Sequence, residues 1–362
     1  MGEWKEYKLG EVLTFQRGYD LPKSEMNGGD IPVAGSNGVI GYHDQYTTKG
    51  PGITIGRSGN IGVPKFYKDN FWAHNTTLYV KDFHGNDEKF MYYFLQLVDF
   101  TQFNSGSAVP SLNRNHIHEL NIFIPSLKEQ KRIASILNSL DDKIDLLLQE
   151  NKTLEAMAET LFRKWFIEDA KEEWEEKDIY TYAEHYKVSI VPNKHPQMFF
   201  RHYSIPAFDN GNEISLEKGE CIQSNKYVVP NNCILFSKLN PHKDKRVWLI
   251  LNETENNAIC STEFQVIKPK RQDYLYFLYG WLINKENYEE ISSGVGGTSS
   301  SHQRIDPKSI FAFSCPNVDI ETIYSYNKVV EPLYYKQKLN KDQIINLKEQ
   351  RSKLLRKLML DK

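Results

Sequence analysis

The stretch that decides the fold is Pro125-Ser126-Leu127-Lys128-Glu129-Gln130-Lys131-Arg132-Ile133, which opens a segment free of glycine and proline up to Phe166. Apolar residues recur along this segment in alternating steps of four and three, with one polar slot at Asn151. A seam that lasts more than four heptads is typical of a coiled coil rather than of one face of a globular helix. The spacing from Ser126 to Glu129 fits a capping box, which predicts that the helix begins here.

A second seam with the same rhythm runs from Tyr326 to Leu358, with polar positions at Gln337, Asn340 and Arg351. Such polar residues fix the register of a coiled coil at a cost in stability. Pro332 is expected near the start of this helix, where proline is least harmful. Residues 318–362 carry 10 basic and 6 acidic groups, against 7 and 9 in residues 127–170.

The opposite charges suit the two helices to pair with each other. Each helix alone would expose its apolar stripe to water, so it needs a partner. The alternative is two separate helices, each packed on its own globular domain. The residues predicted to form the paired seam are Ile133, Leu137, Leu140, Ile144, Leu147, Leu154, Leu161, Val330, Leu333, Ile344, Leu347, Leu354 and Leu358.

The remaining two segments are rich in Tyr, Phe, Val and Ile and are interrupted by Gly, Asn and Pro, which predicts short strands joined by turns. They share four landmarks in the same order, so we expect one plan to occur twice. The predicted chain is α+β, with strand-rich domains at 1–126 and 169–317 and long helices at 127–168 and 318–362. The matched landmarks are Trp4-Lys5-Glu6 with Trp174-Glu175-Glu176, Tyr93-Phe94-Leu95 with Tyr276-Phe277-Leu278, Asn104-Ser105-Gly106 with Ser292-Ser293-Gly294, and Leu120–Ser126 with Phe311–Asn317.

Composition excludes several classes of protein. The 362 residues contain 45 Lys+Arg and 47 Asp+Glu, a net charge of −2, which argues against a generic nucleic-acid coat. No run approaches the roughly 18 apolar residues of a membrane span, and the N-terminus lacks the pattern of a signal peptide. The widely spaced Cys221, Cys233, Cys260 and Cys315 predict reduced thiols in a cytoplasmic protein, with neither a disulfide framework nor a zinc site.

Catalytic signatures are missing from the sequence. It contains no phosphate-binding G-x-x-x-x-G-K-[ST] loop, no G-x-S-x-G, no H-E-x-x-H and no Asp/Asn-Pro-Pro-aromatic tetrapeptide of amino-methyltransferases. His116 and His118 would share a face on a strand, but no further ligands complete a metal site. We therefore expect no catalytic residue, no metal and no cofactor.

The loops instead carry side chains that suit DNA. The glycine-rich turn Gly56–Gly62 presents Arg57, Ser58 and Asn60 between apolar strands. Arg can bond bidentately to guanine and Asn to adenine, whereas the alternative is a plain hairpin turn with a solvated arginine.

The second copy has a basic run at Lys238–Arg246, which is either a phosphate-contacting loop or a solvated one. Matched tracts at 104–115 and 292–304 both end in amide and guanidinium groups before the final strand. The candidate DNA-contacting residues are Tyr42, His43, Arg57, Ser58, Asn60, Asn75, Asn113, Arg114, Lys238, Asn240, His242, Lys243, Lys245, Arg246, Gln303 and Arg304.

This order of parts resembles the specificity subunit of type I restriction-modification systems over essentially the whole chain. The residues that carry the resemblance are Ile124–Ala134, Leu161–Phe166 at the end of the first long helix, and the turn Gly56–Gly62. The second copy departs from the family pattern, because Pro316–Glu321 lacks the Glu-Gln pair.

The resemblance implies two target recognition domains that each read one half of a split double-stranded DNA target. The antiparallel helices would form a coiled-coil spacer of roughly 57 Å, for about 38 residues at 1.5 Å each. The subunit would be non-catalytic and would dock two methyltransferase subunits and the restriction subunits on the outer helix faces, without a membrane. The alternative function is a coiled-coil scaffold that binds only proteins.

Overall fold

The computed structural model describes residues 4–103, 111–211, 213–243, 245–252, 254–293, 295–296 and 303–360. It divides into two compact units, the first made of Met1–Leu146 with Ile344–Lys362 and the second of Leu147–Gln343. The division falls inside both long helices, so each unit combines one strand-rich segment with a part of each helix.

The two long helices are α4 (Leu127–Arg163), which a π-helical turn at Lys164–Glu168 extends, and α9 (Ile320–Met359). In the first unit, Leu137 of α4 belongs to the same buried cluster as Leu355 of α9. In the second unit, the Phe166 ring meets the Tyr326 ring edge-on at 4.9 Å between centroids. The helices therefore run antiparallel in each unit, and all the predicted seam residues are buried or half-buried.

The start of α4 differs from the predicted capping box. The Glu129 carboxylate accepts two hydrogen bonds from the Arg132 guanidinium, at 2.6 and 2.9 Å. The neighbouring Gln130 is 2% exposed, and its side chain ties the helix to the first unit. Its oxygen accepts from the Asp87 N–H at 3.0 Å, and its amide donates to the Asn86 side chain at 2.9 Å and the Pro125 carbonyl at 3.0 Å.

Pro332 lies well inside α9 rather than near its start, because the helix already begins at Ile320. Proline removes the N–H that would bond to the Lys328 carbonyl. Both residues are exposed, so water can satisfy that carbonyl, which lets the helix continue.

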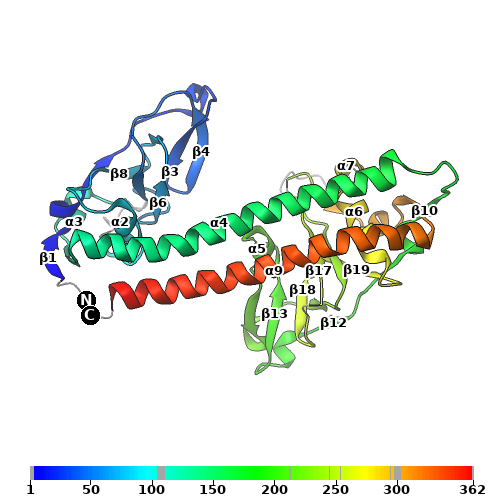
Figure 1. Ribbon diagram of the computed structural model, residues 1–362. Coiled ribbons are helices and arrows are strands. Elements are labelled where there is room, and N and C mark those ends of the chain that lie inside the picture. Colours follow the sequence, from blue (N-terminus) through cyan, green and yellow to red (C-terminus); the bar gives the residue numbers. More distant parts are fainter. Residues whose placement is uncertain are drawn as a thin grey trace. The chain divides into compact units, whose positions relative to one another are not determined.

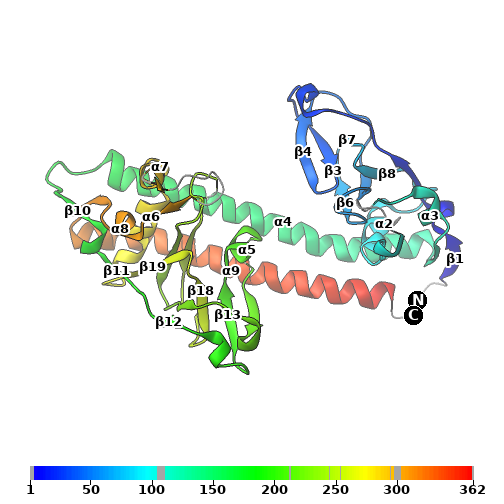
Figure 2. The ribbon, with the colours of Figure 1, turned by 180° about the vertical axis from the view of Figure 1, so that it is seen from behind.

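The first unit is built on an antiparallel sheet in the order β2-β8-β5-β6, with a smaller sheet β4-β3-β7 beside it. The first strand, β1, pairs with the last, β9. Helix α2 lies next to α4 in both views (Figures 1 and 2). The elements are β1 (Lys5–Lys8), α1 (Leu9–Val12), β2 (Thr14–Arg17), β3 (Ile31–Gly35), β4 (Gly38–His43), β5 (Gly52–Gly56), β6 (Pro64–Tyr67), β7 (Trp72–Ala73), β8 (Thr77–Asp82), α2 (Glu88–Leu95), α3 (Arg114–His118) and β9 (Asn121–Ile124).

The second unit repeats this plan and adds to it. Its sheet β11-β19-β16-β17 is again antiparallel in the same order, and β10 pairs with β22 as β1 does with β9. A five-stranded sheet, β12-β15-β18-β13-β14, and the short pair β20-β21 complete it. The predicted α+β fold with an internal repeat is thus confirmed.

Helices α6 and α7 of the second unit lie beside α4 in the figures (Figures 1 and 2). The elements are β10 (Glu176–Asp178), β11 (Ala183–His185), β12 (Ser189–Ile190), β13 (Phe199–Tyr203), α5 (Ile205–Asp209), β14 (Ser215–Lys218), β15 (Lys226–Val228), β16 (Cys233–Ser237), β17 (Val247–Ile250), β18 (Ala258–Ser261), β19 (Phe264–Pro269), α6 (Tyr274–Ile283), α7 (Lys285–Ser293), β20 (Val295–Gly296), β21 (Arg304–Ile305), α8 (Pro307–Phe311) and β22 (Ser314–Pro316). Within the described residues, no helix is both long and apolar enough to cross a membrane.

Candidate nucleic-acid interface

Three segments meet in the first unit where β5 ends. The Arg57 N–H donates to the Thr76 carbonyl at 2.8 Å, and the Leu112 N–H donates to the Arg57 carbonyl at 2.9 Å. Ser58 also forms a β-bridge with Ser111. The glycine-rich turn therefore lies against two segments that are distant from it in sequence. We call this cluster the first edge.

The second unit contains the same arrangement where β16 ends. The Lys238 N–H donates to the Glu263 carbonyl at 3.0 Å, and the Ile305 N–H donates to the Lys238 carbonyl at 3.1 Å. Leu239 forms a β-bridge with Arg304. The two copies therefore share their backbone hydrogen bonds as well as their strand order, and we call this cluster the second edge.

The turn at the first edge depends on its glycines. A Cβ on Gly56 would lie 1.7 Å from the Asn60 carbonyl oxygen, and Gly59 has a φ of +80°. This tight turn leaves Asn60 exposed and Ser58 half-buried. A small residue is needed wherever the backbone closes on itself in this way.

Arg57 is half-buried, and its guanidinium donates to the Asn75 carbonyl oxygen at 3.4 Å. The Asn75 side-chain amide donates to the Asp20 carboxylate, which Arg17 also contacts at 3.4 Å. The structure thus brings the two candidates Arg57 and Asn75 together. Asp20 also belongs to this group, but no sequence pattern indicated it, because only the fold brings it next to Asn75.

Two candidates on β4 differ from each other. Tyr42 is 54% exposed, so its ring is accessible to a partner. His43 is 6% exposed, lies edge-on to Trp72 at 5.1 Å between ring centroids, and accepts from the Asn27 N–H at 3.4 Å. His43 is therefore a core histidine, and its burial removes it from the candidate DNA contacts.

The segment after the first edge forms helix α3. The Asn113 side chain caps this helix by accepting from the Asn115 N–H at 3.0 Å, and Arg114 is exposed beside it. His116 and His118 lie on this helix rather than on a strand. The His118 Nε2 accepts from the Phe15 N–H at 3.0 Å, and burial lowers the pKa of His118. The matched tract Asn104-Ser105-Gly106 lies outside the described residues.

Two arginines of the second unit are held by carboxylates. Arg246 is 7% exposed and makes a bidentate ion pair with Asp209 at 2.6 and 2.9 Å, so its predicted phosphate contact is replaced by a structural role. Arg304 is exposed but also bidentate, to Glu263 at 2.9 and 3.1 Å. The Lys238 ammonium lies 4.0 Å from the same Glu263 carboxylate.

Asn240 and Gln303 are bonded to each other at the second edge. The Asn240 N–H donates to the Gln303 carbonyl at 2.9 Å, and the Asn240 side-chain oxygen accepts from the Gln303 N–H at 3.2 Å. His242 and Lys243 follow as exposed side chains. Asp244, Gly294 and His302, which belong to the predicted loops, lie outside the described residues.

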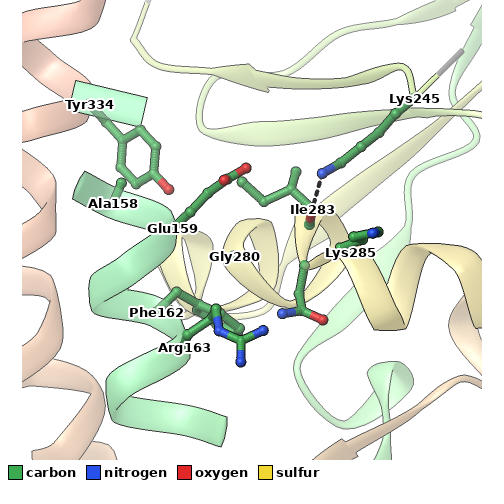
Figure 3. A pocket seen from close by; sticks show the side chains of 10 residues that line it. Ala158, Glu159, Phe162, Arg163, Lys245, Gly280, Ile283, Lys285 and Tyr334 are labelled. Carbon is green, nitrogen blue, oxygen red and sulfur yellow. Dashed lines mark hydrogen bonds between the residues drawn. The ribbon is translucent and has the colours of Figure 1, made fainter. Parts of the chain in front are cut away.

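Lys245 reaches the C-terminal end of α6, where its ammonium donates to the Ile283 carbonyl (Figure 3). The adjoining cavity has a volume of about 90 Å³ and includes Phe162 of α4 and Gly280 of α6. A Cβ on Gly280 would lie 2.2 Å from the Phe162 ring. This cavity therefore borders a close packing contact between α4 and α6, and we assign its residues a structural role.

Within the described residues, no group of three or more His, Cys, Asp or Glu side chains is placed to hold a metal ion. The first edge instead offers guanidinium, amide and hydroxyl groups, and the second edge offers guanidinium, amide and ammonium groups. Groups of these kinds are the ones that can hydrogen-bond to base edges and phosphates, so the chemistry of the two edges is that of a DNA-recognition protein.

Comparisons with known proteins agree with this class. A family model described as the type I restriction modification DNA specificity domain matches residues 1–156. The specificity subunit of the type I restriction enzyme MjaIX from Methanocaldococcus jannaschii is 26% identical over 311 residues, which cover 76% of this chain and 69% of that protein. A Mycoplasma pneumoniae protein described as the N-terminus of a type I specificity subunit, S.MpnORF289P, is 30% identical over 145 residues, which cover 37% of this chain and 76% of that protein.

The chain belongs to the family of type I restriction-modification specificity subunits. A crystal structure of such an S subunit from M. genitalium has the same fold, with a TM-score of 0.65 at 16% identity, covering 100% of this chain and 97% of that one. The chain spans a smaller share of some other relatives, such as 36% of the EcoprrI specificity subunit of Escherichia coli. The family gives this chain a role in DNA sequence specificity.

Proposed function

We propose that the chain reads a two-part double-stranded DNA target, with one part contacted by the first edge and the other by the second edge. The observation that carries the proposal is the repeated hydrogen-bond pattern, Arg57 with Thr76 and Leu112, and Lys238 with Glu263 and Ile305. A repeated module that presents polar side chains at the same place suits two similar reading tasks on one duplex.

The side chains available to DNA differ between the two edges. At the first edge, Arg57 and Asn60 offer a guanidinium and an amide, and Tyr42 on β4 of the same unit adds an exposed aromatic ring. At the second edge, Arg304 is paired with Glu263, and it can exchange this carboxylate for a guanine edge or a phosphate. DNA binding at the second edge therefore requires Arg304 to leave Glu263, whereas DNA binding at the first edge requires no such exchange of an ion pair.

The long helices would serve the partner subunits. In the second unit, Leu148 and Met157 on α4 and Leu339 on α9 are exposed large apolar side chains, at 46%, 48% and 58%. Such side chains outside the seam suit docking of methyltransferase and restriction subunits. In this proposal the partners carry out catalysis in the cytoplasm, where the DNA lies, and the chain itself supplies only recognition.

The test is a binding selection from random-sequence duplexes with the full chain and its methyltransferase partner, combined with mapping of methylated adenines in the source genome. We expect one consensus made of two specified blocks separated by a spacer without specificity. Recovery of no consensus, together with retention of the protein partners, would support the scaffold function instead.

A further inference from the structure

A second cavity, of about 360 Å³, lies next to the second edge. Its wall is formed by the chain that directly follows Asn240, including His242 and Lys243, and by helix α7, including Lys285 and Ser292. Every one of these residues belongs to the second unit. The cavity is several times larger than a water molecule requires, and it is bordered by polar groups.

The Ser292 hydroxyl is buried and, within the described part of the chain, unpaired. Its residue is 2% exposed, and among the described residues its Oγ has no hydrogen-bond partner. Leaving a buried hydroxyl unpaired is costly, so such a group in a cavity wall points to a bound species that accepts its hydrogen bond.

The charges around the cavity are mostly positive. Among the described residues, Lys243, Lys245 and Lys285 line it together with His242, against the Glu289 carboxylate. Glu289 lies 4.0 Å from Lys285, at the limit of an ion pair, and the Lys285 side chain is 83% exposed. The Lys245 ammonium donates to the Ile283 carbonyl, which holds it in place. It therefore contributes positive charge to the cavity wall from a fixed position.

We propose that this cavity binds a phosphate group of the DNA backbone beside the half of the target that the second edge reads. The Ser292 hydroxyl donates to a phosphate oxygen, and the Lys243 and Lys285 ammonium groups neutralise its charge. A phosphate held next to Asn240 sets the register of the duplex against the second edge, because backbone contacts position a protein while base contacts specify the sequence.

This inference rests on the proposed function, and the experiment separates the two. The full chain binds a fluorescent duplex that contains its mapped target, and the affinity is measured between 50 and 200 mM salt. We expect Lys243→Ala and Lys285→Ala each to reduce the slope of log affinity against log salt, and the variant with both substitutions to reduce it by about 0.9, the value for one phosphate contact. Ser292→Ala should weaken binding about tenfold and leave the slope unchanged.

The matched control is Lys177→Ala, which removes the same charge from an exposed lysine of the second unit that lies on β10. A melting curve for each variant checks that the fold is intact. If Lys243→Ala and Lys285→Ala show the slope of the control while the wild type still reads both target blocks, the inference is wrong and the proposed function stands. If the wild type selects no DNA, the proposed function itself fails.

Competition with inorganic phosphate at constant ionic strength distinguishes a free anion from the DNA backbone. We expect phosphate to displace DNA from the wild-type chain more effectively than from Ser292→Ala. Phosphate binding that Ser292→Ala abolishes, without any change in DNA affinity, would identify a site for a free anion and would overturn the inference.

Discussion

Asn340 of α9 donates from its side-chain amide to the Asn151 side-chain oxygen of α4 at 2.9 Å, and to the Glu150 carboxylate also at 2.9 Å. Asn340 is 1% exposed, so this polar contact lies inside the helix pair. The polar slot of one seam therefore faces a polar slot of the other. A shift of either helix along its axis would leave a buried amide unpaired, which fixes the antiparallel register.

Asn340→Ala should lower the free energy of unfolding by about 1–3 kcal/mol, because it leaves the Asn151 amide without its partner. The double variant Asn340→Leu with Asn151→Leu should recover most of this loss, since two apolar residues suit the seam. Urea denaturation of the wild type, Asn340→Leu, Asn151→Leu and the double variant checks the coupling. Additive effects of the two substitutions would show that the two amides do not depend on each other.

Gly280→Ala should destabilise the second unit by about 1–3 kcal/mol, because the added methyl group meets the Phe162 ring at 2.2 Å. The measurement is thermal unfolding. Combining Gly280→Ala with Phe162→Leu should give a smaller loss than the sum of the two single substitutions, because the smaller side chain makes room. A strictly additive pair would count against a steric origin.

Arg57→Ala should relax the sequence preference in one block of the target at a cost of about 1–3 kcal/mol in discrimination, and leave the other block readable. The block lost by Arg304→Ala should be the other one. Methylation mapping with each variant checks this, and Arg132→Ala, on α4, is the control. Loss of both blocks with either variant would contradict the assignment of one edge to one block.

The pH dependence of stability should include His185, which stacks on Phe311 at 4.9 Å between ring centroids. Burial, with smaller effects of Lys187 and Lys238, lowers the pKa of His185 to about 4 from 6.5. The unfolded chain therefore takes up a proton before the folded chain does, so this stability is complete above pH 6.5 and is lost as the pH falls toward 4.

His185→Phe should reduce the slope of unfolding free energy against pH in that window by at most about 1.4 kcal/mol per pH unit. Denaturant titrations at several pH values between 4 and 7 measure the slope. His116→Ala, on an exposed histidine of α3, is the control. An unchanged slope in His185→Phe would show that this imidazole titrates as it does in water.

Sequence patterns over a few neighbouring residues were sufficient to predict the two long helices. The unbroken heptad seam after Pro125 located α4 within a few residues, and the polar slots at Asn151, Asn340 and Arg351 were visible as interruptions of that seam. Arg351 indeed reaches a carboxylate, that of Asp141, at 2.8 Å. Such patterns can be recognised from sequence because helix periodicity relates residues that are three or four positions apart.

The same kind of pattern gave wrong roles for side chains whose partners are distant in sequence. His43 and Arg246 looked like candidate DNA contacts, yet one packs against Trp72 and the other pairs with Asp209. Glu129 fitted a capping box, but Arg132 binds its carboxylate and the buried Gln130 anchors the helix instead. Residue type alone cannot distinguish a side chain that binds a partner from one whose partner is supplied by the fold.

By itself, the sequence determined that the chain has two long helices with apolar seams and two copies of one strand-rich plan, because period and order are properties of the chain. Only the tertiary structure decided which loops meet. It placed Arg57 against Leu112 and Lys238 against Ile305, and it opened the cavity at Ser292. The physical reason is that these contacts join segments more than fifty residues apart, whose backbone groups find partners only when the sheets have formed.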